Sequence, residues 1–324
     1  MAQHFLLSTA ARTLSLATVA RMSDEEARAA FAAIRWADND GKPYCPKCGC
    51  LEVTALATRP VWKCRGCRYQ FSVTAGTLFD NRKKPIRDYL LAIAIFANGA
   101  KGHSALQLSR DLGCQYKTAF VLAHKLREVM EAEQRTAKFS GVSEIDGAYF
   151  GGKQKPRNAI ADRVDRRAVE EQTGKRQVVV VMRQRGGRTL PFVFKKESEG
   201  IQAVRAYIPL GSTIHADEAR GWDILHAHYD MRRVNHSVEY KSEDGACSNQ
   251  AESFFSRLRR AEIGIHHHVS GDYLERYSSE MAWREDHRRT SNGEQSSMIA
   301  AMALRHSRST QFAGYWQRSR SRAA

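Results

Sequence analysis

The chain contains 324 residues, of which 42% are hydrophobic and 27% are charged, and these fractions are typical of a soluble globular protein. The length is too great for one small module and predicts two or three domains. No run of about 18 apolar residues occurs, so we expect no membrane-spanning segment. The formal net charge of +16 favours a polyanionic partner, most often nucleic acid, because each phosphate contact releases condensed counterions.

Residues 1–36 predict a helical N-terminal arm. Ser23 and Glu26 stand three positions apart at the start of a helix-like stretch, and this pattern is typical of a capping box. Because Arg12 interrupts the preceding apolar stretch, we interpret the region as part of the folded protein rather than as a cleaved targeting segment.

Five of the seven cysteines lie between residues 45 and 67. They include two Cys-x-x-Cys pairs, which the fifteen residues 49–63 separate. This spacing is typical of a four-thiolate zinc site, whereas secreted disulfide frameworks are shorter and denser in cysteine. Strand-like runs surround the pairs, so residues 37–80 predict a zinc ribbon with a structural Zn²⁺. The predicted ligands are Cys45, Cys48, Cys64 and Cys67.

Residues 85–135 predict a small all-α domain with helix-turn-helix spacing. A helix that starts near Pro85 is followed by a short helix, a turn that contains Gly113, and a second long helix. A plain helical hairpin gives the same pattern, and the net charge of the chain favours DNA contact over it. The side chains expected to face DNA begin the second helix: Gln115, Tyr116, Lys117 and Thr118.

From residue 141 onward strands alternate with helices, which predicts an α/β core with a mixed sheet flanked by helices. The segments 177–184 and 190–195 surround an Arg-Gly-Gly-Arg turn and predict a β-hairpin. The further elements expected are a helix at 198–208, a strand that ends in acid within 211–222, a helix capped by Ser248 at 248–262 and a last helix at 270–289.

Three carboxylates occupy comparable positions in this region. Asp146 lies in the opening strand, within SEIDGAYFGG, and Asp217 ends a later strand. Glu252 lies one helical turn after Asn249, so these two side chains share a helix face. Three converging carboxylates can hold two divalent cations, and such hard oxygen ligands suit Mg²⁺ or Mn²⁺. Each acid alone could instead cap a helix or pair with arginine. The neighbouring acids left outside the set are Glu144, Glu218 and Asp223.

The order of these elements is that of an RNase H-like nuclease core, and roughly residues 5–290 resemble bacterial insertion-sequence transposases of the DDE type. The branch resembled has an N-terminal zinc ribbon before its catalytic core (the ISXO2-like transposase domain). The stretches that carry the resemblance are RWADNDGKPYCPKCGC, WKCRGCRYQFSVTAGTLF, EIDGAYFGGK, HADEARGW and NQAESFFSRLRRAEIGIHHHVSGDYLERYSSEMAWRED. It implies an RNase H-like catalytic domain over residues 140–295. It gives catalytic roles to Asp146, Asp217, Asn249 and Glu252, with the three acids as Mg²⁺ or Mn²⁺ ligands.

The same resemblance implies cleavage of DNA ends and strand transfer, by in-line attack of water or a 3′-hydroxyl on a phosphodiester. The partner is then double-stranded DNA, at the element ends and at a target site. Joining two ends implies a homodimer or a larger assembly, and we expect a cytoplasmic, nucleoid-associated protein. Two alternatives stay open: a non-catalytic or domesticated DNA-binding regulator that uses only the ribbon and the helix-turn-helix, and an RNA-processing nuclease with the same core.

Basic residues after Glu252 are predicted to contact phosphate, although arginine-rich helix faces are often only solvated. They are Arg257, Arg259 and Arg260. Residues 296–324 are expected to form a basic C-terminal tail, either disordered or bound to phosphate. His215 and the histidine run 266–268 are left outside the catalytic set, since three adjacent side chains cannot all face one ion.

Overall fold

The residues described by the computed structural model are 5–151, 159, 176–234 and 247–315. The chain forms two compact units, one of Met1–Met130 with Arg289–Ala324 and one of Glu131–Arg288. No helix within the described ranges combines the length and the hydrophobicity that a membrane crossing needs.

The first unit is built mainly from helices. Its α-helices are α1 (Leu16–Arg21), α2 (Asp24–Arg35), α3 (Ile86–Asn98), α4 (Ala105–Asp111), most of α5 (Tyr116–Gln134) and α9 (Asn292–Arg305). α9 packs on α2 and α3, so the end of the chain returns to helices near its start. The predicted tail 296–324 therefore begins as a packed helix, because Ile299, Ala300 and Ala303 bury an apolar face of α9.

The predicted capping box at the start of α2 is confirmed. The Oγ of Ser23 accepts a hydrogen bond from the N–H of Glu26 at 3.2 Å, and the carboxylate of Glu26 accepts from the N–H of Ser23 at 2.7 Å. Further along, Phe31 and Trp36 are buried, so the predicted arm is part of a packed unit at this point.

A three-stranded antiparallel sheet follows α2. Its strands are β1 (Val53–Ala55), β2 (Trp62–Cys64) and β3 (Gln70–Phe71). The ring of Trp36 meets the ring of Trp62 edge to face, with 5.4 Å between the centroids. Because so small a sheet buries little apolar surface, we infer that its order depends on this aromatic contact and on the nearby cysteines.

The second unit contains a five-stranded sheet with the strand order β6-β5-β4-β7-β8. The strands are β4 (Ser143–Phe150), β5 (Gln177–Gln184), β6 (Thr189–Phe194), β7 (Thr213–Asp217) and β8 (Asp230–Val234). β4, β5 and β6 are antiparallel neighbours, whereas β7 pairs parallel with β4 and β8 pairs parallel with β7. The predicted mixed sheet and its hairpin are confirmed, and β8 is a strand that the sequence analysis missed.

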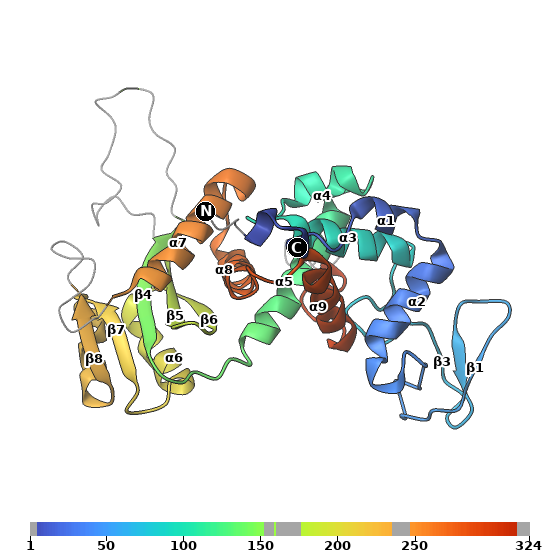
Figure 1. Cartoon of the computed structure of the whole chain (residues 1–324), viewed down its shortest axis with the longest axis horizontal. Helices are drawn as coiled ribbons and strands as arrows, with labels where there is room; N and C mark the ends of the chain where they lie inside the picture. The colour runs from blue at the N-terminus through green and yellow to red at the C-terminus, as the bar shows by residue number, and fades with distance from the viewer. Residues whose placement is uncertain (1–4, 152–158, 160–175, 235–246, 316–324) are drawn as a thin grey trace, which may run out of the picture. The chain divides into compact units, whose positions relative to one another are not determined.

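Helices cover both faces of this sheet (Figure 1). They are α6 (Gly200–Tyr207), α7 (Asn249–Ala261) and α8 (Gly271–Asp286). α7 and α8 pack on the face to which Val179 and Val181 point, and α6 packs on the face to which Val178 and Val180 point. β5 is therefore apolar on both faces, which explains its continuous hydrophobic run.

A buried carboxylate at the end of α8 holds this helix to the hairpin. Asp286 accepts hydrogen bonds from Arg183 at 2.7 Å and from the N–H and the hydroxyl of Thr189 at 3.1 and 2.6 Å. The side chain of Arg183 is only 7% exposed, so this carboxylate is needed to stabilise its buried positive charge.

Replacing Asp286 by alanine is expected to lower the free energy of unfolding by about 3–5 kcal/mol, because a buried guanidinium loses its main counter-charge. It leaves Arg183 with the more distant carboxylate of Glu285, at 3.9 Å. Urea denaturation followed by circular dichroism measures the loss. Asp272→Ala, which removes an exposed acid from the first turn of the same helix, is the matched control and should lose no more than about 1 kcal/mol. Equal losses in the two variants would contradict the prediction.

Candidate active site and zinc centre

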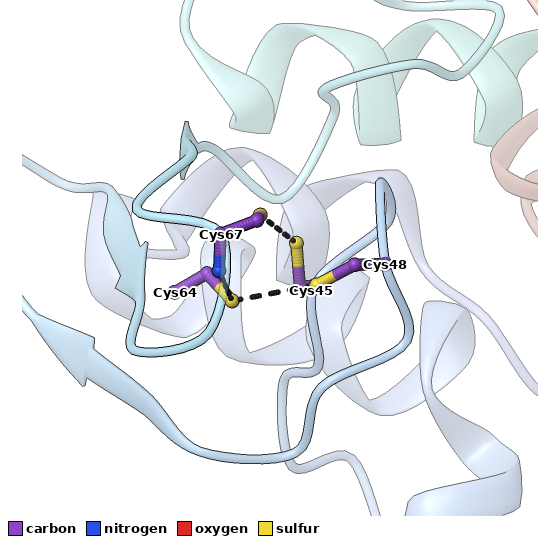
Figure 2. A group of neighbouring side chains, drawn as sticks. All are labelled: Cys45, Cys48, Cys64 and Cys67. Carbon is purple, nitrogen blue, oxygen red and sulfur yellow. Dashed lines mark hydrogen bonds between the residues drawn. The ribbon is translucent and has the colours of Figure 1, made fainter.

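The four predicted zinc ligands converge from two turns of the small sheet (Figure 2). The Sγ atoms of Cys45 and Cys67 are 3.6 Å apart, as are those of Cys48 and Cys64, and all four lie within 4.8 Å of one another. Four sulfurs at about 2.3 Å from a tetrahedral zinc ion are separated by about 3.8 Å, so this spacing fits Zn²⁺. The separations are far too long for disulfides, which need about 2.05 Å.

The backbone around the cysteines prepares them to bind a cation. The N–H of Cys67 donates to the Sγ of Cys64 at 3.4 Å and lowers the pKa of that thiol to about 6, which favours the thiolate that zinc binds. Gly49 follows the first pair with a φ of +73°, a conformation that favours glycine. Cys50 lies outside the group, and its thiol points to the carbonyl oxygen of Glu52 at 3.8 Å.

Asp146 and Asp217 lie on adjacent strands and point to the same face of the large sheet. The parallel strands β4 and β7 pair Ile145 with Ala216, so the next step of the register brings the two aspartates side by side. On its other side Asp146 pairs with Val181, whose side chain packs under α7. Because side chains alternate along a strand, both aspartates face α7.

Negative charge is concentrated at this point of the sheet. Burial raises the pKa of Asp146 to about 7, and the charges of Asp217, Glu197 and Glu252 contribute to the rise, against one N–H that Gly147 donates at 2.7 Å. Neither aspartate forms an ion pair with a lysine or arginine in the described part of the chain. A divalent cation would relieve this repulsion, so the donor set fits such an ion.

The acids are more widely spaced than the ligands of a single ion. Among the residues that the structure describes, the four cysteines alone form a group of three or more possible ligands within 4.8 Å of one another. At least two of Asp146, Asp217 and Glu252 are therefore further apart than this. Two ions about 3.5–4 Å apart would connect such a wider set.

The other two predicted catalytic residues lie in the first turn of α7. Asn249 begins the helix, Glu252 follows three positions later, and both are exposed. Further along the same helix, Phe254 and Phe255 are buried against the sheet. The charge of Glu252 adds to the raised pKa of Asp146 and is the smallest of its causes.

A fourth carboxylate close to these acids, Glu197, was missed by the sequence analysis. It begins the 3₁₀ turn η6 (Glu197–Glu199) between β6 and α6, and it lies against Gly147. A Cβ at position 147 would be 2.0 Å from its Oε1, so any larger residue would displace the carboxylate. Burial and the charge of Asp217 both raise the pKa of Glu197. The available signal was the glycine directly after Asp146, because nothing in the sequence around Glu197 is distinctive.

The start of α7 is capped from a strand and not by its own N-cap residue. Glu144 of β4 is fully buried, and its Oε2 accepts from the N–H groups of Gln250 at 2.8 Å and Ala251 at 3.1 Å. Ser248, predicted to cap this helix, stands at the N-cap position, but its side chain makes no capping bond. That prediction was wrong because Ser248 has φ −116° and ψ 21°, not the extended conformation of a capping serine.

Arg185 joins this cap to β7. Its Nε donates to the Oε1 of Glu144 at 3.1 Å, and its Nη2 lies 2.9 Å from the Nδ1 of His215 and 3.2 Å from the carbonyl oxygen of Cys247. The N–H of Cys247 also donates to the Nδ1 of His215, at 3.1 Å. Glu144 and His215, which we left outside the catalytic set, thus belong to a buried network beside it.

The residues predicted to face DNA in the first unit are exposed. The turn between α4 and α5 contains Gly113 with a φ of +55°. Gln115, Tyr116, Lys117 and Thr118 all lie exposed at or just before the first turn of α5. A cavity of about 490 Å³ lies beside them. Among its lining residues are the basic side chains Arg82, Lys83, Lys84, Lys117, Lys125 and Arg308.

The three arginines predicted to contact phosphate differ in their surroundings. Arg257 forms a two-point pair with the carboxylate of Glu285, each contact 2.8 Å long. Arg259 and Arg260 are exposed on α7. The pairing gives Arg257 a role in holding α8 to α7, and the phosphate contacts stay a prediction.

The histidine run 266–268 does not converge on one point. The ring of His266 packs against the ring of Tyr277, with 4.5 Å between the centroids. The next residue, His267, has a φ of +58°, so the backbone changes direction within the run.

Two families of known domains match this chain. Residues 138–286 match the ISXO2-like transposase domain, and residues 22–70 match the transposase zinc-ribbon domain. The first range contains all four candidate catalytic residues, and the second contains the four clustered cysteines. The chain therefore carries a transposase zinc ribbon and an ISXO2-like transposase domain, which confirms the resemblance seen in its sequence.

A relative from a transposable element is also similar to part of the chain. An uncharacterized protein in transposable element ISH50 of Halobacterium salinarum is 25% identical over 131 residues. The match spans 40% of this chain and 42% of the relative, so it covers less than half of each protein. No solved structure matches the chain significantly.

We predict that Cys64→Ser abolishes zinc binding, because a tetrahedral site loses one of its four thiolates. Metal analysis of the purified protein should find about one zinc ion per wild-type chain and almost none in the variant. Cys50→Ser, which alters the neighbouring thiol outside the cluster, is the matched control and should keep its zinc. Retention of zinc by Cys64→Ser would contradict the four-cysteine site.

The raised pKa of Asp146 predicts a pH-dependent stability. Between its ordinary value of about 4 and its folded value of about 7, the folded chain holds a proton that the unfolded chain has released. The contribution of Asp146 to stability is therefore present below pH 4 and is lost as the pH rises towards 7. In buffer without Mg²⁺ or Mn²⁺, Asp146→Asn should melt at a higher temperature than the wild type at pH 8 and at a similar temperature at pH 4.

Added Mn²⁺ should raise the melting temperature of the wild type at pH 8 and leave that of Asp146→Asn unchanged, because ligand binding stabilises only the form that binds. Asp272→Asn controls for the loss of one negative charge. A wild type whose stability between pH 4 and pH 8 changes no more than that of Asp146→Asn would count against the charge cluster.

Proposed function

We propose that this chain, given its transposase domain and transposase zinc ribbon, is the transposase of an insertion sequence. In this proposal it cleaves DNA at the ends of the element and transfers the strands by in-line attack of water or a 3′-hydroxyl on a phosphodiester. Asp146, Asp217 and Glu252 hold Mg²⁺ or Mn²⁺, and Asn249 assists from the same helix turn as Glu252.

The observation that carries the proposal is the pairing of two unneutralised aspartates on adjacent strands. The chain has a net charge of +16, yet within the described ranges no lysine or arginine is paired with Asp146 or Asp217. A structural aspartate in so basic a protein would be expected to pair with arginine, as Glu144 and Asp286 do. The strand order β6-β5-β4-β7-β8 further supports an RNase H-like core.

A bound pair of divalent cations supplies activation of the attacking oxygen and stabilisation of the leaving oxygen. The residues of the site supply negative charge and hold the reacting groups in position. Asp146, with a pKa near 7, loses its proton as the pH rises through neutrality, so its affinity for a cation would rise with pH. Among the residues that the structure describes, Glu252 and Asn249 are exposed, so a phosphodiester can approach from the helix side.

We further infer that the first unit binds duplex DNA. The exposed start of α5 carries side chains able to reach base edges, and the basic residues around the adjacent cavity suit contacts with phosphates. The joining of two DNA ends implies that at least two chains act together.

The test is cleavage of a plasmid that carries the gene for this chain with its native flanking DNA. Asp217→Asn should lower the rate of end cleavage in Mg²⁺ by at least about 100-fold, because the metal site supplies several kcal/mol of transition-state stabilisation. Its binding to the same DNA should persist. The control is Glu218→Gln, which changes the exposed acid next to Asp217 and should cleave like the wild type.

Other outcomes would favour the alternatives. A wild-type protein that binds these ends but never cleaves them would support a DNA-binding regulator. Faster hydrolysis of an RNA–DNA hybrid than of the element ends would support an RNA-processing nuclease. Unchanged cleavage by Asp217→Asn would contradict the assigned site.

A further inference from the structure

We propose that Glu144, Arg185 and His215 are positioning residues, which hold the first turn of α7 so that Glu252 reaches the ions bound by Asp146 and Asp217. The inference rests on the proposed function, since it assigns the three residues to the assembly of that metal site. None of the three is among the proposed metal ligands.

The cap made by Glu144 fixes the start of α7 in place. A helix start leaves N–H groups without partners, and Glu144 satisfies two of them, those of Gln250 and Ala251. A carboxylate at this end of a helix is also favoured by the helix dipole. Because Ser248 forms no side-chain cap, the strand β4 takes over this role from the helix's own sequence.

Arg185 and His215 complete the attachment from the neighbouring strand. Arginine and a backbone N–H can only donate, so the Nδ1 of His215, which faces Arg185 and the N–H of Cys247, must be an acceptor. His215 is therefore neutral, with its proton on Nε2. In this form it joins β7 to Cys247, the residue just before the N-cap of α7.

The spacing along the chain connects this network to the proposed ligands. Glu144 is two residues before Asp146 on β4, and His215 is two residues before Asp217 on β7, so each pair shares one face of its strand. Gln250 and Ala251, which Glu144 caps, are directly before Glu252 on α7. The network thus ties the helix turn that carries Glu252 to the two strands that carry Asp146 and Asp217.

The first experiment is a titration of the full-length protein with Mn²⁺, in which electron paramagnetic resonance measures the free ion. Glu144→Gln should weaken the affinity by about 10–100-fold, the usual effect of losing a residue that orients metal ligands. Glu252→Gln should weaken it by a similar factor, and the double variant should be no weaker than Glu252→Gln, because both changes act through one ligand. Asp272→Asn, the exposed helix-start control, should bind like the wild type.

The second experiment does not depend on metal binding. Hydrogen exchange followed by mass spectrometry on residues 249–258 should be faster in Glu144→Gln than in the wild type, because the first turn of α7 has lost its cap. It should be unchanged in Glu252→Gln. If Glu144→Gln fails to fold, Arg185→Lys is the substitute variant, because it keeps the charge but loses the multi-point contact of the guanidinium.

The outcomes separate this inference from the proposed function. Loss of Mn²⁺ binding in Asp146→Asn, together with wild-type affinity or wild-type exchange in Glu144→Gln, overturns the positioning role alone. An additive loss in the double variant also overturns it, because the two residues then act separately. Wild-type Mn²⁺ binding in Asp146→Asn overturns the metal site and the inference with it.

Discussion

The parallel pairing of β4 and β7 forces two carboxylates together on one face of the sheet. Because Ile145 pairs with Ala216, the next residues of the two strands, Asp146 and Asp217, lie side by side. α7 covers the face to which they point. Burial and, after it, the neighbouring charge of Asp217 raise the pKa of Asp146 to about 7. Two neighbouring carboxylates without a cationic side chain favour the binding of a cation, and we infer that this cation is divalent.

Two acids on β4, Glu144 and Asp146, have opposite electrostatic surroundings. Glu144 is fully buried, and it pairs with Arg185 and accepts hydrogen bonds from two helix N–H groups. Asp146, two residues further along, has one N–H donor and several negative neighbours. Environment rather than residue type therefore separates the structural acid from the candidate catalytic one, as burial and neighbours generally do for paired carboxylates. The basic residues of the chain are arranged accordingly, with Arg185 directed at Glu144 and Arg183 at Asp286.

Local patterns in the sequence predicted the local elements well. The spacing of the cysteines predicted the thiolate cluster because a metal site depends on short-range geometry, and the apolar runs predicted β5, β6, α7 and α8. What the sequence did not reveal depends on contacts between distant segments. Glu144 caps α7 through the N–H of Gln250, 106 positions later in the chain, so no local pattern distinguishes Glu144 from Glu218. Ser248 matched the local preference for serine at a helix N-cap, but the capping group is the carboxylate of Glu144 on β4.

Glu197 and α9 were missed for the same physical reason. Glu197 comes close to the two aspartates because Gly147 leaves room for its carboxylate, a relation between β4 and a turn fifty residues later. Most of α9 was assigned to a basic tail because the last twenty residues hold five arginines and no acid, and only packing on α2 and α3 shows that the helix has a buried face. The predicted set of Asp146, Asp217 and Glu252 came from element order and from family resemblance, not from periodicity.

The central claim is that these acids bind divalent cations. A crystal structure of the protein soaked in Mn²⁺, with the ions located by their anomalous scattering, tests it most directly. We predict two ions about 3.5–4 Å apart, both in contact with Asp146 or Asp217 and at least one with Glu252. Anomalous density only elsewhere in the chain, with an arginine or lysine paired to Asp146, would contradict it.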